Sequence, residues 1–159
     1  MRKALVSVLL LIALSLSSFS QTFTLTDSQC TVGNYYRTYN LAFDLGKTTL
    51  RSESFPHLDS IAAFLNTNSS LKLEIGVHTD SRVCESDITS SRKLHQARAK
   101  AIADYMTEQG IAADRLIAKG YGCFHLLITD AAISKLKTKE EIEAAHQKNR
   151  RVEFKILAI

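Results

Sequence analysis

Four stretches of the chain carry the hydrophobic patterns and turn boundaries that are typical of β-strands. They are residues 41–45, 71–77, 116–121 and 152–156. Between them, apolar residues recur at spacings of three and four, or follow a helix-start signal, which indicates helices. The helical stretches are residues 58–65, 94–105, 130–136 and 139–147. This order predicts a βαβαβαβ fold of the α+β class, with a four-stranded mixed sheet and helices on one or both of its faces.

Single residues mark where these helices begin and end. Pro56 stands at a helix-opening position, and Gly110 closes the second helix. Asp130 is expected to cap the short third helix, and Thr138 with Glu141 three residues later forms a capping-box pattern. The helix boundaries are therefore predicted by signals that are separate from the hydrophobic periodicity.

The first twenty residues differ in composition from the rest of the chain. Residues 1–3 are Met-Arg-Lys, residues 4–19 are apolar with serines, and small residues close the segment. This pattern is typical of a secretory signal peptide, and the run is shorter than the roughly 20 apolar residues that a membrane span needs. We expect a signal peptide over residues 1–20, a short leader over residues 21–38 and one domain over residues 39–159.

Composition favours a globular, exported domain and argues against nucleic acid as a partner. Hydrophobic residues make up 45% of the chain and charged residues 23%, which are ordinary globular values. Arg2 and Lys3 of the signal peptide carry two of the four net positive charges, and the remaining acids and bases are interspersed. We expect a periplasmic protein with no membrane span in the mature chain. Any attachment to the outer membrane is then indirect, through the cell wall or an outer-membrane protein partner.

The three cysteines are expected to include one disulfide, because disulfides persist in exported proteins. Cys84 and Cys123 each follow a predicted strand, so a bridge between the two loops is the favoured pairing. Cys30 is then left free or pairs between chains. Spacing alone does not prove this pairing.

Two charged residues are candidates for binding. Asp80 ends the run His78-Thr79-Asp80, where a buried-pattern strand meets polar residues. Arg98 lies on the following helix near its apolar stripe, where its guanidinium needs an anion. Taken alone, such an aspartate more often caps a turn or helix, and such an arginine more often makes a structural ion pair.

Several short motifs change this interpretation. They are Phe43-Asp44 with Leu50, His78-Thr79-Asp80, Leu94 with Arg98-Ala99, and Asn149-Arg150-Arg151-Val152-Glu153. Between the last two lie Gly110-Ile111, Arg115-Leu116 and Gly120-Tyr121-Gly122. With these motifs in this order, the chain from about residue 41 to residue 157 resembles the peptidoglycan-binding domain shared by OmpA, Pal and MotB-type proteins.

The resemblance implies binding of peptidoglycan, with no cofactor, no metal and no catalysis. Family members hold the diaminopimelate of the stem peptide with the aspartate and the arginine that correspond to Asp80 and Arg98. A free amino-acid end carries an ammonium and a carboxylate on one carbon. A fixed carboxylate and a forked guanidinium therefore recognise both groups together.

Four further positions follow from the same resemblance. Thr79 is expected to donate its hydroxyl to the ligand, Leu94 to pack on its aliphatic part, and Asp44 to lie near the site. Arg150 has two equal interpretations, an inward-facing ion pair at the sheet edge or a ligand contact.

The chain also departs from the family pattern around the proposed clamp. Val77 stands where a glycine is usual, with Gly76 one position earlier, and no glycine follows between residues 80 and 91. Ser91 and His95 replace the more usual asparagine and serine, and the segment from the aspartate to the arginine is about three residues longer. These changes keep both charges but alter the loop between them.

Three alternatives remain open at this point. A zinc site would use residues of suitable type in this region, namely His78, Asp80, Cys84, Cys123 and His125. An enzyme would use Cys84 as a nucleophile with His78 or His95 as its base, although no flanking signature supports this. An envelope interaction module would keep the fold and lose wall binding.

Overall fold

The computed structural model describes residues 24–25 and 30–159 of the chain. The strands are β1 (Tyr35–Thr38), β2 (Lys72–His78), β3 (Leu116–Gly122) and β4 (Arg151–Ala158). The helices are α1 (Phe55–Thr67), α2 (Ser81–Ser86), α3 (Ile88–Glu108), α4 (Asp130–Ile133) and α5 (Lys139–Asn149), with 3-10 turns at Ser52–Ser54 and Ala113–Arg115. In this part of the chain no helix is both long and apolar enough to cross a membrane. The expected signal peptide over residues 1–20 lies outside the described residues.

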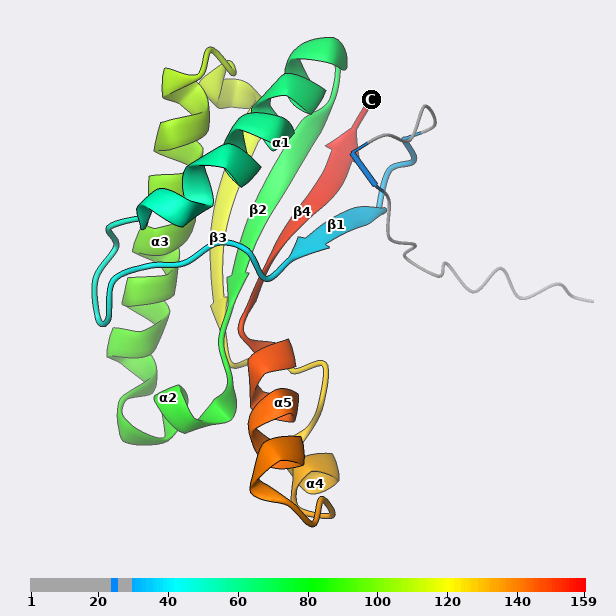
Figure 1. Cartoon of the computed structure of the whole chain (residues 1–159). Coiled ribbons are helices and arrows are strands. Elements are labelled where there is room, and N and C mark those ends of the chain that lie inside the picture. The colour runs from blue at the N-terminus through cyan, green and yellow to red at the C-terminus, as the bar shows by residue number, and fades with distance from the viewer. Residues whose placement is uncertain (1–23, 26–29) are drawn as a thin grey trace, which may run out of the picture.

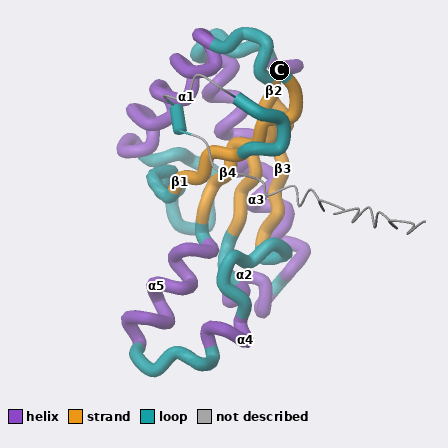
Figure 2. Tube along the Cα trace, turned by 90° about the vertical axis from the view of Figure 1, so that its right-hand side faces the viewer, coloured by secondary structure: helices purple, strands orange, loops and turns teal. Residues whose placement is uncertain are grey.

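The described strands form one mixed four-stranded sheet in the order β1-β4-β2-β3. β2 and β3 are parallel, whereas β4 is antiparallel to both β1 and β2. Among the described elements, α1 and α3 lie on the same face of the sheet, and α4 and α5 lie beyond one of its ends (Figures 1 and 2). The predicted α+β class and mixed sheet are confirmed, with the long helices on a single face.

The alternation of side chains along the strands explains which face the helices cover. In β2, Leu73, Ile75 and Val77 are buried in the core, while the residues between them point to the other face. The same alternation holds in β4. The core residues opposite these strands come from one stripe of α1 and one stripe of α3, namely Leu58, Ile61, Leu65, Ala99, Ile102 and Met106.

Local capping signals place most helix ends. Pro56 lies in the first turn of α1, and the capping box of Thr138 and Glu141 is present at the start of α5. The predicted cap at Asp130 is wrong, because the side chain of Thr129 caps α4 by accepting a hydrogen bond from Ala132. The helix predicted over residues 94–105 also begins earlier, at Ile88, since the Asp87 carboxylate accepts bonds from two backbone N–H groups of the first turn.

The strand predicted over residues 41–45 is wrong. Phe43 makes only an isolated bridge with Leu50, and Leu45 is 99% exposed. The position beside β4 is taken instead by Tyr35–Thr38, which lies inside the stretch that we expected to be a leader. Alternating polarity indicates a strand only where a sheet edge is free to pair with it, and this edge is already occupied.

The candidate binding residues Asp80, Arg98 and Arg150 lie at one end of the sheet. The strands β1, β2 and β3 end there and β4 begins there, because β4 runs antiparallel to its neighbours. The short helix α2 and the α4–α5 segment lie at this same end (Figure 1).

Helix α3 approaches the edge strand β3 most closely at Gly120. A Cβ atom on this glycine would lie 2.1 Å from the backbone nitrogen of Gln96. The Gln96 side chain accepts a bond from Gly120 N–H at 2.8 Å and donates to the Ala118 carbonyl at 3.0 Å. Gln96 therefore covers the outer edge of the sheet, and the missing side chain at Gly120 sets the position of α3.

We predict that Gly120→Ala lowers the free energy of unfolding by about 2 kcal/mol or more, because backbone atoms of α3 cannot yield as a flexible side chain can. Gly76→Ala is the matched comparison, since its added Cβ would meet the Tyr121 ring at 3.0 Å and not a backbone. Urea denaturation of both variants measures the difference. An equal loss in the two variants would contradict the proposed role of Gly120.

Candidate functional site

Asp80 is a buried carboxylate at the end of β2. It follows Thr79, whose backbone N–H donates to the Gly122 carbonyl at 2.9 Å, and it is 1% exposed. Its Oδ2 accepts hydrogen bonds from Arg82 Nη2 at 3.0 Å and from Arg150 Nη1. Its side chain does not cap α2, and its Oδ1 has no hydrogen-bond partner in the described part of the chain. The carboxylate thus belongs to an ion cluster.

Glu143 of α5 completes this cluster. Its carboxylate accepts bonds from Arg82 Nη1 at 3.0 Å and from Arg150 Nη2 at 2.5 Å, and these bonds lower the pKa of Glu143 to about 2. For Asp80, burial raises the pKa, but the bonds from Arg82 and Arg150 outweigh burial and hold the pKa below its ordinary value. Both acids are therefore charged at neutral pH, and the two arginines balance them.

Arg98 reaches the same end of the sheet from α3. Its Nε donates to the Lys47 carbonyl at 2.9 Å and its Nη2 to the Asp44 carbonyl at 3.3 Å. Its guanidinium carbon lies 4.8 Å from the centre of the Phe43 ring. Two of the five N–H donors of the guanidinium are thus used to fix its position, and with respect to the described residues the other three are available to an anion.

A pocket of about 320 Å³ lies at this end of the sheet. It is lined by Thr38, Tyr39, Leu41, Ala42, Phe43, Val77, His78, Thr79, His95, Arg98, Gln147, Arg150, Arg151 and Val152. Three of these residues are arginines and none is acidic, so the pocket favours an anionic group. Asp80 lies beside this lining, next to Thr79 in sequence and hydrogen-bonded to Arg150.

The structure brings part of the predicted set together. Thr79, Arg98 and Arg150 line the pocket, and Arg150 makes an ion pair with Asp80. Asp44 contributes its backbone carbonyl to Arg98, whereas its carboxylate takes no part in that contact. Leu94 is half-buried on α3 and is not part of the lining.

Sequence reasoning missed other residues of the site. Arg82 was missed, although its place two residues after a strand-end aspartate is a weak signal for an ion pair. Tyr39 was missed because the strand before it falls in the expected leader. His95 was noted as a departure from the family and as a candidate base for an enzyme, but not as part of the binding site. It is buried, donates from Nδ1 to the Ser91 carbonyl at 2.6 Å, and has its pKa lowered mainly by burial.

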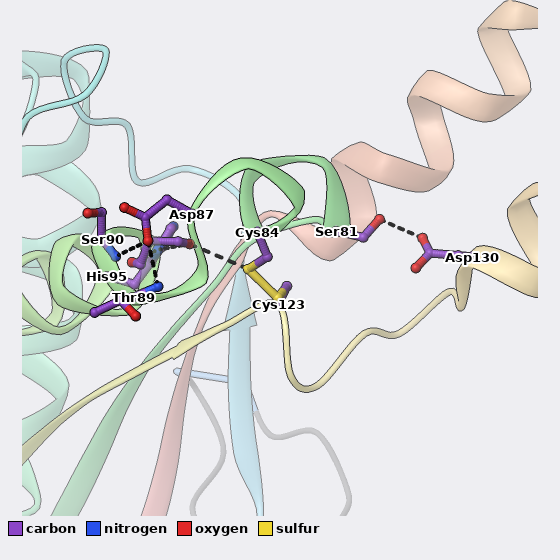
Figure 3. Close-up of a disulfide and its surroundings, with 9 residues drawn as sticks. Ser81, Cys84, Asp87, Thr89, Ser90, His95, Cys123 and Asp130 are labelled. Atoms are coloured by element: carbon purple, nitrogen blue, oxygen red, sulfur yellow. Dashed lines mark hydrogen bonds between the residues drawn. A yellow bond between two sulfur atoms is a disulfide. The ribbon is translucent and has the colours of Figure 1, made fainter.

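Cys84 and Cys123 form a disulfide, as predicted. It ties α2 to the residue that follows β3, and Ser81 Oγ ties the start of α2 to Asp130 at 2.5 Å (Figure 3). The disulfide removes both thiolates on which the zinc interpretation relied, and one of them, Cys84, is the nucleophile of the enzyme interpretation. Within the described residues, no group of three or more histidines, cysteines or acids is placed to hold a metal ion.

We predict that reduction of this disulfide lowers the free energy of unfolding by about 3 to 4 kcal/mol, because the bridge closes a loop with a sequence separation of 39. Chemical denaturation with and without dithiothreitol measures the loss. The double variant Cys84→Ser, Cys123→Ser is the control, and its free energy of unfolding should be the same with and without dithiothreitol. Equal stability of the reduced and oxidised protein would contradict the prediction.

We also predict that the Asp80 ion pairs contribute acid sensitivity. Because the folded pKa of Asp80 is depressed, its stabilisation is complete above the unfolded pKa of about 3.9 and is lost as pH falls through the lower folded value. Asp80→Asn should lower the free energy of unfolding by about 1 to 3 kcal/mol at pH 7. Between pH 4 and pH 2, the free energy of unfolding should fall less in this variant than in the parent. Urea melts across this range test it, and parallel acid slopes would contradict it.

Comparison with known proteins agrees with this geometry. The model of the OmpA family matches residues 42–150. Outer membrane protein P5 of Haemophilus influenzae is 32% identical over 117 residues, which are 74% of this chain and 32% of that protein. The chain therefore spans about a third of the length of this curated relative.

Solved structures show the same fold. The cell wall anchor of the T6SS from Pseudomonas aeruginosa is 27% identical with a TM-score of 0.58, over 79% of this chain and 80% of that one. A MotB-like protein from Desulfovibrio vulgaris is 20% identical with a TM-score of 0.61, over 79% of this chain and 73% of that one. The order of the motifs, the mixed sheet and the family match lead to one conclusion: this chain belongs to the OmpA family.

Proposed function

We propose that this protein binds peptidoglycan without covalent chemistry, and that Asp80 and Arg98 hold the free amino-acid end of the diaminopimelate in the stem peptide. Asp80 accepts hydrogen bonds from the ammonium group and Arg98 donates to the carboxylate. The role is attachment to the cell wall, with no catalysed reaction and no cofactor.

The observation that carries this proposal is the unpaired oxygen of Asp80. Oδ1 is buried and has no donor among the described residues. A buried charged acceptor without a partner costs at least about 1 to 3 kcal/mol, and an arriving ammonium supplies the missing donors. A ligand regains this free energy when it brings a positively charged hydrogen-bond donor to Oδ1.

The arginines of the pocket supply the other half of the recognition. Arg98 is fixed by two carbonyl groups and an aromatic ring, so little side-chain entropy is lost when a carboxylate binds. Each charge-assisted bond contributes about 1.5 to 3 kcal/mol before the cost of association. Contacts of this size fit a reversible interaction.

Adjacent residues have supporting roles in this proposal. Thr79 lines the pocket and has a hydroxyl available to the ligand, and Arg150 orients the Asp80 carboxylate through Oδ2. Leu94, which is half-buried on α3 one turn before Arg98, packs on the aliphatic part of the ligand in this proposal. Asp44 holds Arg98 through its carbonyl.

The comparisons support the same role. The T6SS neighbour is described as a cell wall anchor, and the Haemophilus relative is an outer membrane protein. We therefore propose a periplasmic location after export by a signal peptide, at the cell wall and beside the outer membrane. An outer-membrane protein partner would complete the link between wall and membrane.

We predict that the purified protein co-sediments with diaminopimelate-type cell wall, and that Asp80→Ala or Arg98→Ala lowers the bound fraction at least about tenfold, as expected for loss of a charged contact. The bound fraction is measured by densitometry of the pellet. Lysine-type cell wall, which lacks the second carboxylate, should bind weakly.

Matched controls separate loss of binding from loss of fold. Asp114→Ala and Arg92→Ala remove an exposed acid and an exposed base away from the pocket, and both should pellet like the parent. Thermal unfolding confirms that each variant is folded. If the Asp80 and Arg98 variants pellet as well as the parent, the chain is an envelope module without this binding site.

A further inference from the structure

Arg82 occupies one side of the carboxylate that the proposed ligand needs. It lies on α2, two residues after Asp80, and its Nη2 donates to Asp80 Oδ2 at 3.0 Å. Its Nη1 donates to Glu143 Oε2 at 3.0 Å, so one guanidinium bridges two acids. A guanidinium and an ammonium are both cationic donors, so they compete for the charge of the same carboxylate even where they contact different oxygens.

The Arg82 side chain is the more accessible of the two cations on Asp80. It is 45% exposed, whereas the Arg150 side chain is 32% exposed. Arg150 is also bound through Nε and Nη2 to Gln147 Oε1, at 3.1 and 2.5 Å, and it stands directly before β4. Arg82 is therefore the cation that can leave Asp80 with less rearrangement of the sheet.

Glu143 is a second interaction partner for the Arg82 guanidinium. If the Asp80 contact breaks, the bond from Arg82 Nη1 to Glu143 Oε2 is kept, and the charge of the guanidinium remains balanced. Asp80 in turn keeps its bond from Arg150 and can offer both oxygens to a new donor. The exchange therefore leaves no buried charge without a partner.

The backbone of α2 keeps Arg82 close to this position. The disulfide from Cys84 to Cys123 fixes the middle of α2, and the bond from Ser81 to Asp130 fixes its start (Figure 3). Arg82 lies between these two attachments. Only its side chain has to move when Asp80 changes partner.

We propose that Arg82 is an internal competitor of the ligand, a guanidinium that holds Oδ2 of the Asp80 carboxylate and withdraws to Glu143 when the ammonium group of an amino-acid ligand binds this carboxylate. This inference rests on the proposed function, since it assigns Asp80 to the ligand's ammonium group. Arg82 thereby sets both the affinity of the site and its preference for ligands that carry an amine.

The test is a calorimetric titration of the oxidised full-length mature protein with two probes. One probe is meso-diaminopimelate, and the other is pimelate, which has the same carbon chain and carboxylates without the amines. Arg82→Ala should bind diaminopimelate about two- to fivefold more tightly than the parent, as expected for removal of a half-exposed ion pair. Pimelate should gain nothing, because it brings no donor for Asp80.

Two further variants define the mechanism. Arg82→Lys keeps a cation near Asp80 and should bind diaminopimelate with an affinity between those of the parent and Arg82→Ala. Arg92→Ala removes an exposed arginine from α3 and should bind like the parent. Circular dichroism verifies that every variant is folded.

The outcomes separate the two proposals. If Asp80→Asn binds diaminopimelate as well as the parent, the proposed function fails at its site. If Asp80→Asn loses binding while Arg82→Ala binds equally or less tightly than the parent, only the competitor role is overturned. An equal gain for pimelate would also overturn it, because Arg82 would then be a simple obstruction.

Discussion

The burial of one charge, the Asp80 carboxylate, is the constraint on which this end of the molecule depends. A buried carboxylate without counter-ions costs several kcal/mol, so donors must come to it. Arg82 arrives from α2 and Arg150 from the junction of α5 and β4, while Glu143 holds both arginines. Segments far apart in sequence are thereby fixed against the end of β2.

A second constraint places the other half of the site. The contact between Gly120 and the backbone of Gln96 brings α3 against β3, and Arg98 lies two residues further along the helix. The loop after β1 then folds over Arg98 and supplies carbonyl acceptors and the Phe43 ring. The pocket is lined by α3, the end of β1 with the loop after it, the end of β2, the end of α5 and the start of β4. Most of its lining therefore lies on rigid elements, which position side chains more precisely than loops do.

The charges that stabilise the folded protein also affect which charged groups the pocket favours. The ion cluster is balanced internally, whereas the pocket beside it is lined by three arginines and no acid. An anionic group is attracted to the pocket by this excess of positive charge. In the proposed function, an ammonium group by contrast competes with cations of the protein itself. The proposed preference for a zwitterionic ligand then depends on how readily Arg82 leaves the Asp80 carboxylate.

Much of the fold could be predicted from local signals. The alternating residues of β2 and β4, Pro56 at the start of α1 and the Thr138 capping box depend on contacts within a few residues, which the sequence displays directly. The first strand could not be placed in this way. Residues 41–45 alternate, but the edge of β4 pairs with Tyr35–Thr38, and pairing between distant segments leaves no local signal.

For the site, the sequence by itself determined the charged residues, the family and the pairing of Cys84 with Cys123 as the favoured disulfide. Only the tertiary structure decided their partners. Asp80 is hydrogen-bonded to Arg82 and Arg150, and Arg98 to the backbone of the loop after β1. The physical reason is that a charge can be read from one residue, whereas its counter-ion depends on which segments the folded sheet brings together.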